Sequence, residues 1–103
     1  MFVEEVDEGD LIAEALGDKK VIILQNHGIL TTGPSVDIAL WFYTSMERCC
    51  QAQLMADAAG ETQLIPHDTA IKTRSFIAND VAAWASFQPA FDMICKKEPD
   101  LFD

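Results

Sequence analysis

The sequence has few basic residues, and this shortage excludes two classes of partner. Seven Lys and Arg are outnumbered by 17 Asp and Glu, which gives a formal net charge of -10. The basic residues are scattered along the chain and form no stripe. Binding to nucleic acid or to an anionic membrane therefore lacks its main electrostatic driving force. We predict neither nucleic acid nor membrane as a partner.

Long apolar runs and paired cysteines are also missing. No apolar stretch approaches the roughly 18 residues that span a bilayer, and the start, MFVEEVDEGD, is acidic where a signal peptide is basic. The three cysteines, Cys49, Cys50 and Cys95, include no C-x-x-C pair. An odd number with two neighbours favours reduced thiols in a cytoplasmic protein.

The usual short motifs of enzymes are absent as well. There is no G-x-G-x-x-G, Walker A loop, G-x-S-x-G elbow or H-E-x-x-H, so nucleotide binding, acyl transfer and zincin chemistry have no motif support. What the chain does have is 103 residues, half of them apolar. That is enough for one small domain or for a piece of a larger one.

The first third of the chain predicts two short strands. We expect residues 1–9 to be irregular and Asp10 to cap a short helix that ends at Gly17. Val21–Gln25 is apolar enough for a strand buried on both faces, and Ile29–Thr32 predicts a second strand. Two strands are not stable alone in water, so further strands or helices must pack on them.

The rest of the chain predicts helices. Ser35 and Gly60 are suitable ends for one long helix. Its apolar side chains recur every three or four residues and predict a broad buried face, with a subunit contact over part of it: Val36, Ala39, Leu40, Tyr43, Met46, Cys50 and Leu54, widened by Phe42, Cys49 and Ala56. We expect a loop over residues 61–77, with a short helix over 68–73.

A last helix is expected from Asp80, after Asn79 as its cap. Pro89 predicts a kink or a division into two helices. Four apolar side chains at helical spacing are expected to face the core: Trp84, Phe87, Phe91 and Ile94.

Asn26-His27-Gly28, between the two predicted strands, is the main candidate for a site. Either His27 is a turn or core residue, or its imidazole binds a metal such as Zn²⁺. A catalytic zinc site needs about three protein ligands. The other histidine, His67, lies far along the chain, where it would pair with Asp68 or face solvent. If His27 is a ligand, most of the others must come from outside this chain.

Three further groups have less support as sites. Glu47 and Arg48 are adjacent in the long predicted helix, and we favour a solvated face or a subunit ion pair over a catalytic pair. Only Arg48 lies beside Cys49 and Cys50, so we interpret these thiols as packing residues. Tyr43 is expected in the core.

Three segments together resemble the class II aldolase/adducin family. Residues 21–33, VIILQNHGILTTG, resemble its strand–Asn-His-Gly–strand segment. Residues 39–60, ALWFYTSMERCCQAQLMADAAG, resemble its long helix, and residues 84–101, WASFQPAFDMICKKEPDL, resemble the closing helix of one branch. The resemblance implies an α/β fold: residues 1–103 would be the C-terminal portion of a three-layer αβα domain, with two short strands, one long helix and C-terminal helices.

The resemblance also implies a chemistry. Family enzymes hold a divalent metal, usually zinc, with three histidines: a His-x-His pair upstream and the Asn-His-Gly histidine, which matches His27. The metal polarises a carbonyl of a small-molecule substrate and stabilises the enediolate left when a carbon–carbon bond breaks. An upstream glutamate acts as acid and base, and many members are homo-oligomers.

This chain departs from that pattern, because it contains no His-x-His and no segment resembling that of the upstream glutamate. The resemblance therefore implies a C-terminal fragment of a metal-dependent aldolase-like lyase, inactive alone, whose metal is completed by ligands outside the chain. The alternative is a non-catalytic, adducin-like assembly or interaction module.

Overall fold

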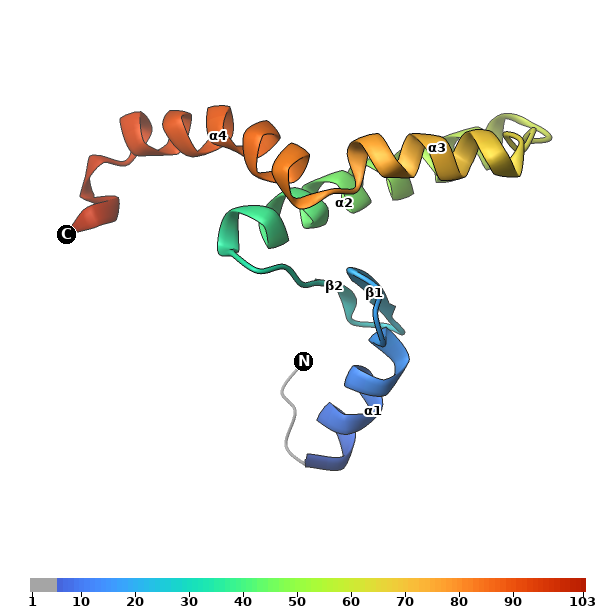
Figure 1. Ribbon diagram of the computed structural model, residues 1–103, viewed down its shortest axis with the longest axis horizontal. Coiled ribbons are helices and arrows are strands. Elements are labelled where there is room, and N and C mark those ends of the chain that lie inside the picture. Colours follow the sequence, from blue (N-terminus) through green and yellow to red (C-terminus); the bar gives the residue numbers. More distant parts are fainter. Residues whose placement is uncertain (1–5) are drawn as a thin grey trace.

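The computed structural model describes residues 6–103 (Figure 1). The order of elements is helix α1 (Val6–Leu16), strands β1 (Val21–Leu24) and β2 (Gly28–Thr31), helices α2 (Val36–Ala59), α3 (His67–Ile77) and α4 (Asp80–Lys97), and a 3₁₀ turn, η1 (Pro99–Phe102). The predicted α/β class is confirmed. Over the residues described, none of the helices has the combined length and apolar character that crossing a bilayer requires.

The two strands form an antiparallel hairpin, with Val21 opposite Thr31 and Leu24 opposite Gly28. Figure 1 shows α1 on one side of the hairpin and the other three helices on the opposite side. The prediction that β1 is buried on both faces is wrong for this chain, since Ile23 is 60% exposed. Within residues 6–103 the sheet has only these two strands, and no further strand covers that side chain.

Helix α2 has the ends predicted for it. The Ser35 hydroxyl oxygen accepts a hydrogen bond from the backbone N–H of Ile38 at 3.4 Å, and the helix stops at Ala59, before Gly60. This cap satisfies one of the amide groups that a helix start leaves without a partner. The Thr31 hydroxyl of β2 donates to the carbonyl of Ala39 at 2.7 Å, which ties the hairpin to the first turn of α2.

The core lies where the hairpin, α2 and α4 meet. Its buried side chains are Ile38, Phe42 and Ala83, with Val21 and Trp41 packed against them. The predicted buried face of α2 is right for Phe42, which is 8% exposed, and wrong for Leu40 and Tyr43, which are each 44% exposed. Ile38 and Phe42 are one helical turn apart, and their face is the one that meets both other elements.

The predicted limits are wrong for α1 and α3, and one of two predicted alternatives is excluded for α4. Helix α1 spans Val6–Leu16, so it includes residues before Asp10 that were expected to be irregular. The remaining part of the predicted irregular segment, residues 1–5, lies outside the described residues. The predicted loop with a short helix is the full helix α3, which has no Pro or Gly after Pro66. Helix α4 runs through Pro89, so two separate helices do not form.

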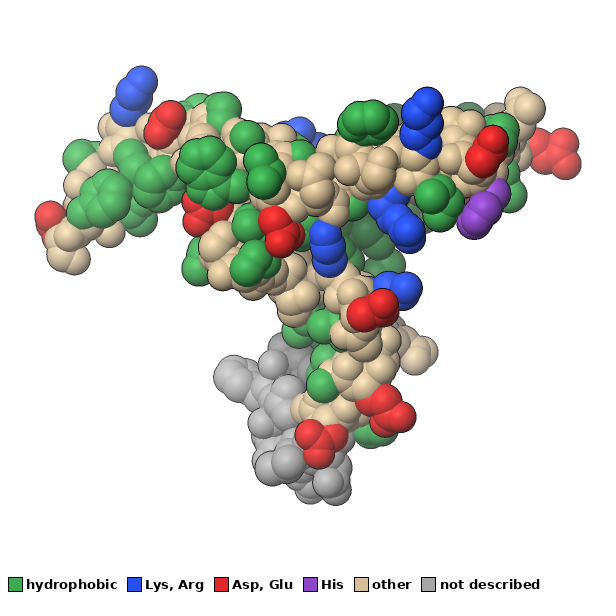
Figure 2. Space-filling model, in the orientation of Figure 1, with side chains coloured by type: hydrophobic (Ala, Val, Ile, Leu, Met, Phe, Trp, Pro, Cys, Tyr) green, Lys and Arg blue, Asp and Glu red, His purple; other side chains and the backbone are tan. Residues whose placement is uncertain are grey.

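The chain is much more open than a compact protein of its mass. Its accessible surface is 8506 Å², whereas a compact monomer of this mass exposes about 5,800 Å². Its radius of gyration is 16.5 Å, against about 13 Å for a compact domain of this length. Apolar side chains gather on the surface of α4 and η1 (Figure 2).

That openness overturns the prediction that the apolar stripe of α4 faces the core. Trp84 is 51% exposed, and Phe91 and Ile94 are 37% and 40% exposed. Ala83, which the stripe did not include, is fully buried against α2. Only the first half of α4 has α2 beside it, so the stripe continues beyond the core.

Candidate functional site

The Asn26-His27-Gly28 segment forms the tip of the hairpin. The backbone N–H of His27 donates to the carbonyl of Leu24 at 3.1 Å, which closes a four-residue turn. Asn26, the third residue of that turn, has a φ of 63°, a conformation that Asn and Gly tolerate best. Gly28 follows with a φ of 134°, which L-residues rarely adopt. The sequence Asn-x-Gly is thus required by the backbone here.

His27 is held by this turn with its side chain exposed. The exposed side chain excludes the predicted role of a buried core residue. The backbone of His27 lies in the turn, as the other structural alternative predicted. The exposed imidazole keeps its nitrogens accessible to a ligand. A hairpin tip fixed by four ladder pairs and a closed turn can hold a metal ligand in a defined position. The metal role of His27 stays a prediction.

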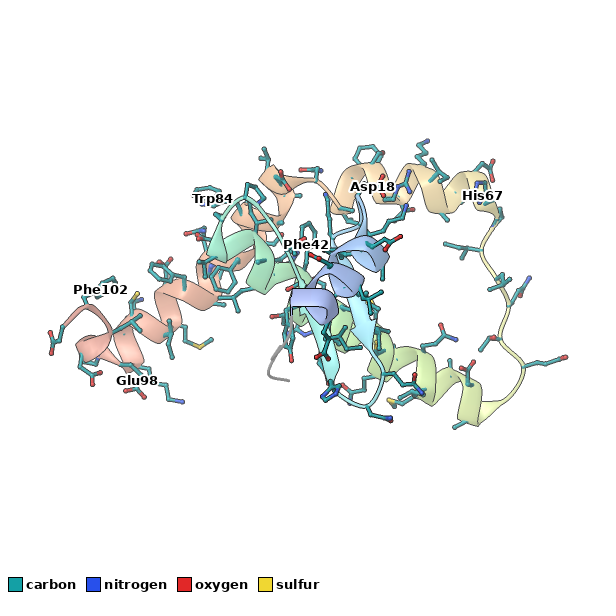
Figure 3. The ribbon with its side chains drawn as sticks, turned by 90° about the horizontal axis from the view of Figure 1, so that it is seen from below. Asp18, Phe42, His67, Trp84, Glu98 and Phe102 are labelled. Atoms are coloured by element: carbon teal, nitrogen blue, oxygen red, sulfur yellow. The ribbon has the colours of Figure 1, made fainter. Side chains whose placement is uncertain are left out.

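The described residues do not form a complete metal site. No three His, Cys, Asp or Glu side chains lie close enough together to hold an ion anywhere in residues 6–103. His67 is the first residue of α3, exposed, and Figure 3 places it at the outer end of that helix, away from the hairpin. It was expected in a loop exposed to solvent; the exposure is confirmed, and the loop is wrong. A metal site that included His27 would therefore need donors from outside the described residues.

The remaining candidates do not gather around His27. Glu47 and Arg48 are exposed on α2, as expected for a solvated face, and neither forms an ion pair with another described residue. Cys49 is exposed, so its interpretation as a packing residue is wrong; Cys50 and Cys95 are partly buried, and all three thiols are free. Tyr43, expected in the core, is 44% exposed.

One important residue was missed by reasoning from the sequence. The Lys20 ammonium donates to the backbone carbonyl of Ala78, lies 3.9 Å from the Asp80 carboxylate, and sits 4.9 Å from the centre of the Phe42 ring. It therefore joins the start of β1 to α2 and to the α3–α4 junction. Its backbone partner Ala78 is 58 residues away along the chain, and no local pattern indicates it.

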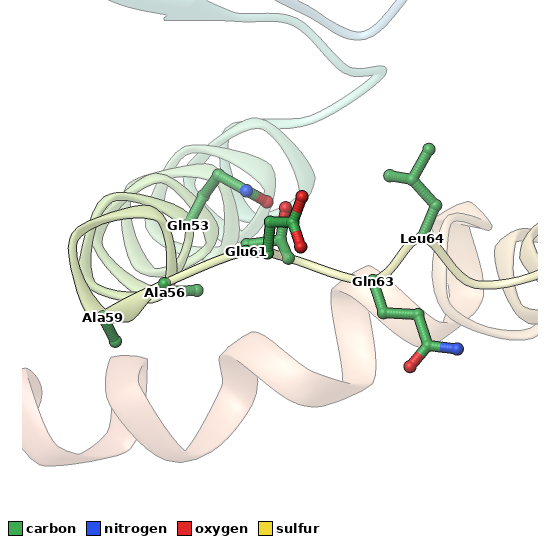
Figure 4. Close-up of a pocket in the computed structure, with 8 residues that line it drawn as sticks. Gln53, Ala56, Ala59, Glu61, Gln63 and Leu64 are labelled. Atoms are coloured by element: carbon green, nitrogen blue, oxygen red, sulfur yellow. The ribbon is translucent and has the colours of Figure 1, made fainter.

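Two surface hollows lie away from the hairpin tip. One, of about 470 Å³, is lined by Gln53, Glu61 and other residues where α2 ends and the next segment begins (Figure 4). The other, of about 690 Å³, contains Lys19, Lys20 and Arg74. Lys19 is paired with Asp18 at 3.6 Å, and Lys20 has the partners named above. Most of the positive charge in the second hollow is thus already compensated, and neither hollow contains a histidine.

Comparison with known proteins identifies the family. The sequence profile of the "Class II Aldolase and Adducin N-terminal domain" matches residues 2–54, which is half of the chain. The chain belongs to the class II aldolase and adducin family. The match covers the hairpin with His27 and most of α2, the two segments whose geometry is given above.

Relatives of different kinds share this part of the domain. Decarboxylase NovR of Streptomyces niveus is 39% identical over 95 residues, covering 92% of this chain and 35% of that protein. Alpha-adducin of Rattus norvegicus is 37% identical over 68 residues, covering 63% of this chain and 9% of its own length. The structure of an L-fuculose 1-phosphate aldolase from Glaciozyma antarctica PI12 matches with a TM-score of 0.86 and 40% identity, covering 93% of this chain and 39% of that one.

The arrangement of the elements therefore agrees with part of a class II aldolase fold. The chain spans about a third of the length of two curated Streptomyces relatives, 35% of one and 34% of the other. The large exposed surface is consistent with this partial coverage.

Proposed function

We propose that this chain is the C-terminal part of a divalent-metal-dependent, aldolase-like lyase, and that His27 is one of its metal ligands. The observation that carries the proposal is the exposed imidazole at a closed hairpin tip, in a segment that the family profile matches. The proposed setting is cytoplasmic, and the substrate is a small molecule with a carbonyl group.

The proposal divides the site between this chain and other residues. Imidazole nitrogen is a common donor for zinc, and an open catalytic site takes about three protein ligands. Since the described residues form no group of three possible ligands, the proposal takes the others from outside this chain. A bound divalent cation would supply Lewis-acid polarisation of the substrate carbonyl. The paired strands and the closed turn of the hairpin would hold the imidazole at a fixed position.

The same division explains why the isolated chain is proposed to be inactive. A single histidine binds a divalent ion too weakly to hold it at a defined position, and it leaves the ion's other positions to water. We expect no carbon–carbon bond cleavage by the 103-residue chain with added zinc. Turnover by the chain alone, at a rate that falls in His27→Ala, would contradict this part of the proposal.

A chimera tests the ligand role directly. In the L-fuculose 1-phosphate aldolase from Glaciozyma antarctica PI12, this chain replaces the aligned portion, which is 39% of that protein. Bound zinc is then measured by mass spectrometry after dialysis. We expect about one metal per chain, and a loss of affinity of at least tenfold in His27→Gln, roughly the least that removing even a supporting group costs. His67→Gln is the matched control and should keep its metal. Equal metal in both variants would reject the proposal.

An adducin-like, non-catalytic module is the second candidate. It is favoured by the match to alpha-adducin and by the lack of a three-ligand cluster in the described residues. In this case the chimera would fold without zinc, and His27→Gln would change neither metal content nor assembly.

A further inference from the structure

We propose that the hollow between the start of β1 and α3 binds a phosphate group, carried by free phosphate or by a phosphate monoester. We call this hollow, of about 690 Å³ and lined by Lys19, Lys20 and Arg74, the basic hollow. The inference goes beyond the proposed function. It involves neither a metal nor His27, which lies beyond the other end of β1.

Positive charge is concentrated in the basic hollow. Three of the seven Lys and Arg of a chain with net charge -10 line it, and Figure 2 shows basic side chains gathered between α3 and the hairpin. The acids close by are Asp18, which also lines the hollow, and Asp80, which lies 3.9 Å from the Lys20 ammonium. The local charge is therefore positive even when both acids are counted.

Each of the three cations can still bind an anion. Arg74 forms no ion pair with another residue of 6–103, and a guanidinium group can bind two phosphate oxygens at once. The Lys20 ammonium has three N–H donors and two partners among the described residues, one carbonyl and one carboxylate. The pair of Lys19 with Asp18 is a surface pair, since the Asp18 side chain is 91% exposed, and such pairs contribute little to stability.

The packing of α3 gives an independent reason for an anion at this place. Among the described residues, α3 packs on α4 and on no other helix or strand. Its Arg74 lines the same hollow as the two lysines that precede β1, and like charges on opposite sides of a hollow repel each other. A phosphate dianion between them would attract both sides. Binding should therefore hold α3 against the base of the hairpin.

The rest of the hollow leaves room for a group attached to the phosphate. A volume of about 690 Å³ is in the range of small-molecule pockets and exceeds what a phosphate alone fills. Val21, Ile71 and Ala78 place apolar side chains beside the cations. We therefore expect a phosphate monoester with a small apolar group to bind more tightly than inorganic phosphate.

The first experiment is a nuclear magnetic resonance titration of the ¹⁵N-labelled 103-residue chain. The probes are inorganic phosphate, phenyl phosphate and succinate, with sodium chloride at equal ionic strength as the blank. We expect saturable shifts of the amides of residues 18–21 and 71–79 with both phosphate probes, and slower hydrogen exchange in α3. Tighter binding of phenyl phosphate would identify a monoester, and equal affinity would identify free phosphate. No saturable shift, shifts that chloride reproduces, or tighter binding of succinate would overturn the proposal.

Two variants of α3 separate a site from general charge attraction. Arg74→Gln should weaken phosphate binding at least about tenfold, because a hydrogen bond to a charged group contributes about that much. Lys72→Gln is the matched control, since it removes one charge from the same helix at a residue that does not line the hollow. Arg74→Lys keeps the charge and should recover part of the affinity. Equal weakening by Arg74→Gln and Lys72→Gln would overturn the proposal.

Both experiments leave the core and the metal question aside. Lys20 is not altered, because its ammonium also contacts the ring of Phe42 in the core. Arg74 and Lys72 are exposed, so their replacement should leave the fold intact. No metal is added, so the proposed function succeeds or fails separately.

Discussion

Apolar side chains are buried where the hairpin meets α2, whereas similar side chains are exposed in residues 91–102, the C-terminal arm. At the junction, residues 20–42, Ile38 and Phe42 are buried, and hydrogen bonds from Thr31 and Ser35 fix the approach of the strands to the helix. On the arm, Phe91 and Phe102 contact each other but remain 37% and 71% exposed. Apolar side chains are therefore buried where the hairpin, α2 and the start of α4 pack together. They stay exposed where α4 extends beyond these elements.

The largest effect expected from this comparison is at Phe42. Phe42→Ala removes a ring that is 8% exposed and supports the Lys20 ammonium, and we expect a loss of about 3–5 kcal/mol in the free energy of unfolding. Trp84→Ala, at 51% exposure, should cost less than about 2 kcal/mol. Urea denaturation followed by circular dichroism compares the two. Similar losses would mean that the core is not confined to the junction.

Gly28→Ala tests the turn that holds His27. The new methyl group meets open space, so the cost comes from the φ of 134° alone, and we expect about 1–3 kcal/mol. Asn26→Gly is the control, because a φ of 63° suits glycine and the change should cost little. Thermal unfolding measures both. If Gly28→Ala were neutral, the strained turn would not be needed to place His27.

Removing the caps of α2 and α4 in turn compares the local stability of the junction with that of α4. Ser35→Ala removes the acceptor at the start of α2, and Asn79→Ala removes the 2.8 Å acceptor for the N–H of Ala82 at the start of α4. Each should cost about 1 kcal/mol. Hydrogen exchange should locate the first effect in the hairpin and α2, and the second in α4. Exchange that rises equally everywhere in both variants would show that the two regions unfold together.

The smallest effect on stability is expected on the arm. Phe102→Ala should change the unfolding free energy of the dilute monomer by less than about 0.5 kcal/mol, as is usual for exposed positions. Urea denaturation measures this change, and a large loss would place Phe102 in the core.

The elements that the sequence predicted well depend on local signals. Ser35 and Gly60 end α2 because a cap and a stop act within a few residues, and Asn26-Gly28 marks the hairpin tip for the same reason. The α/β class and the family resemblance followed from the same segments. The start of α1 and the length of α3 were not predicted because both segments contain weak helix formers, such as Gly9 in α1.

The burial of side chains was harder to predict than the elements themselves. The face of α2 that is buried depends on where the hairpin and α4 pack, and the role of Lys20 depends on Ala78 and Asp80, far along the chain. The stripe on α4 was expected in a core, yet its second half has nothing against it among the described residues. The exposed position of His27 at the hairpin tip is observed, and its role as a metal ligand stays a prediction.

The most direct test of the account is the nuclear magnetic resonance signal of the His27 ring nitrogens in the ¹⁵N-histidine-labelled chimera, identified by comparison with His27→Gln. On addition of one equivalent of Zn²⁺, we expect one ring nitrogen of His27 to shift to the range of a metal-bound imidazole, while His67 stays unchanged. Zinc that binds with full occupancy and leaves both His27 nitrogens unshifted would contradict the account.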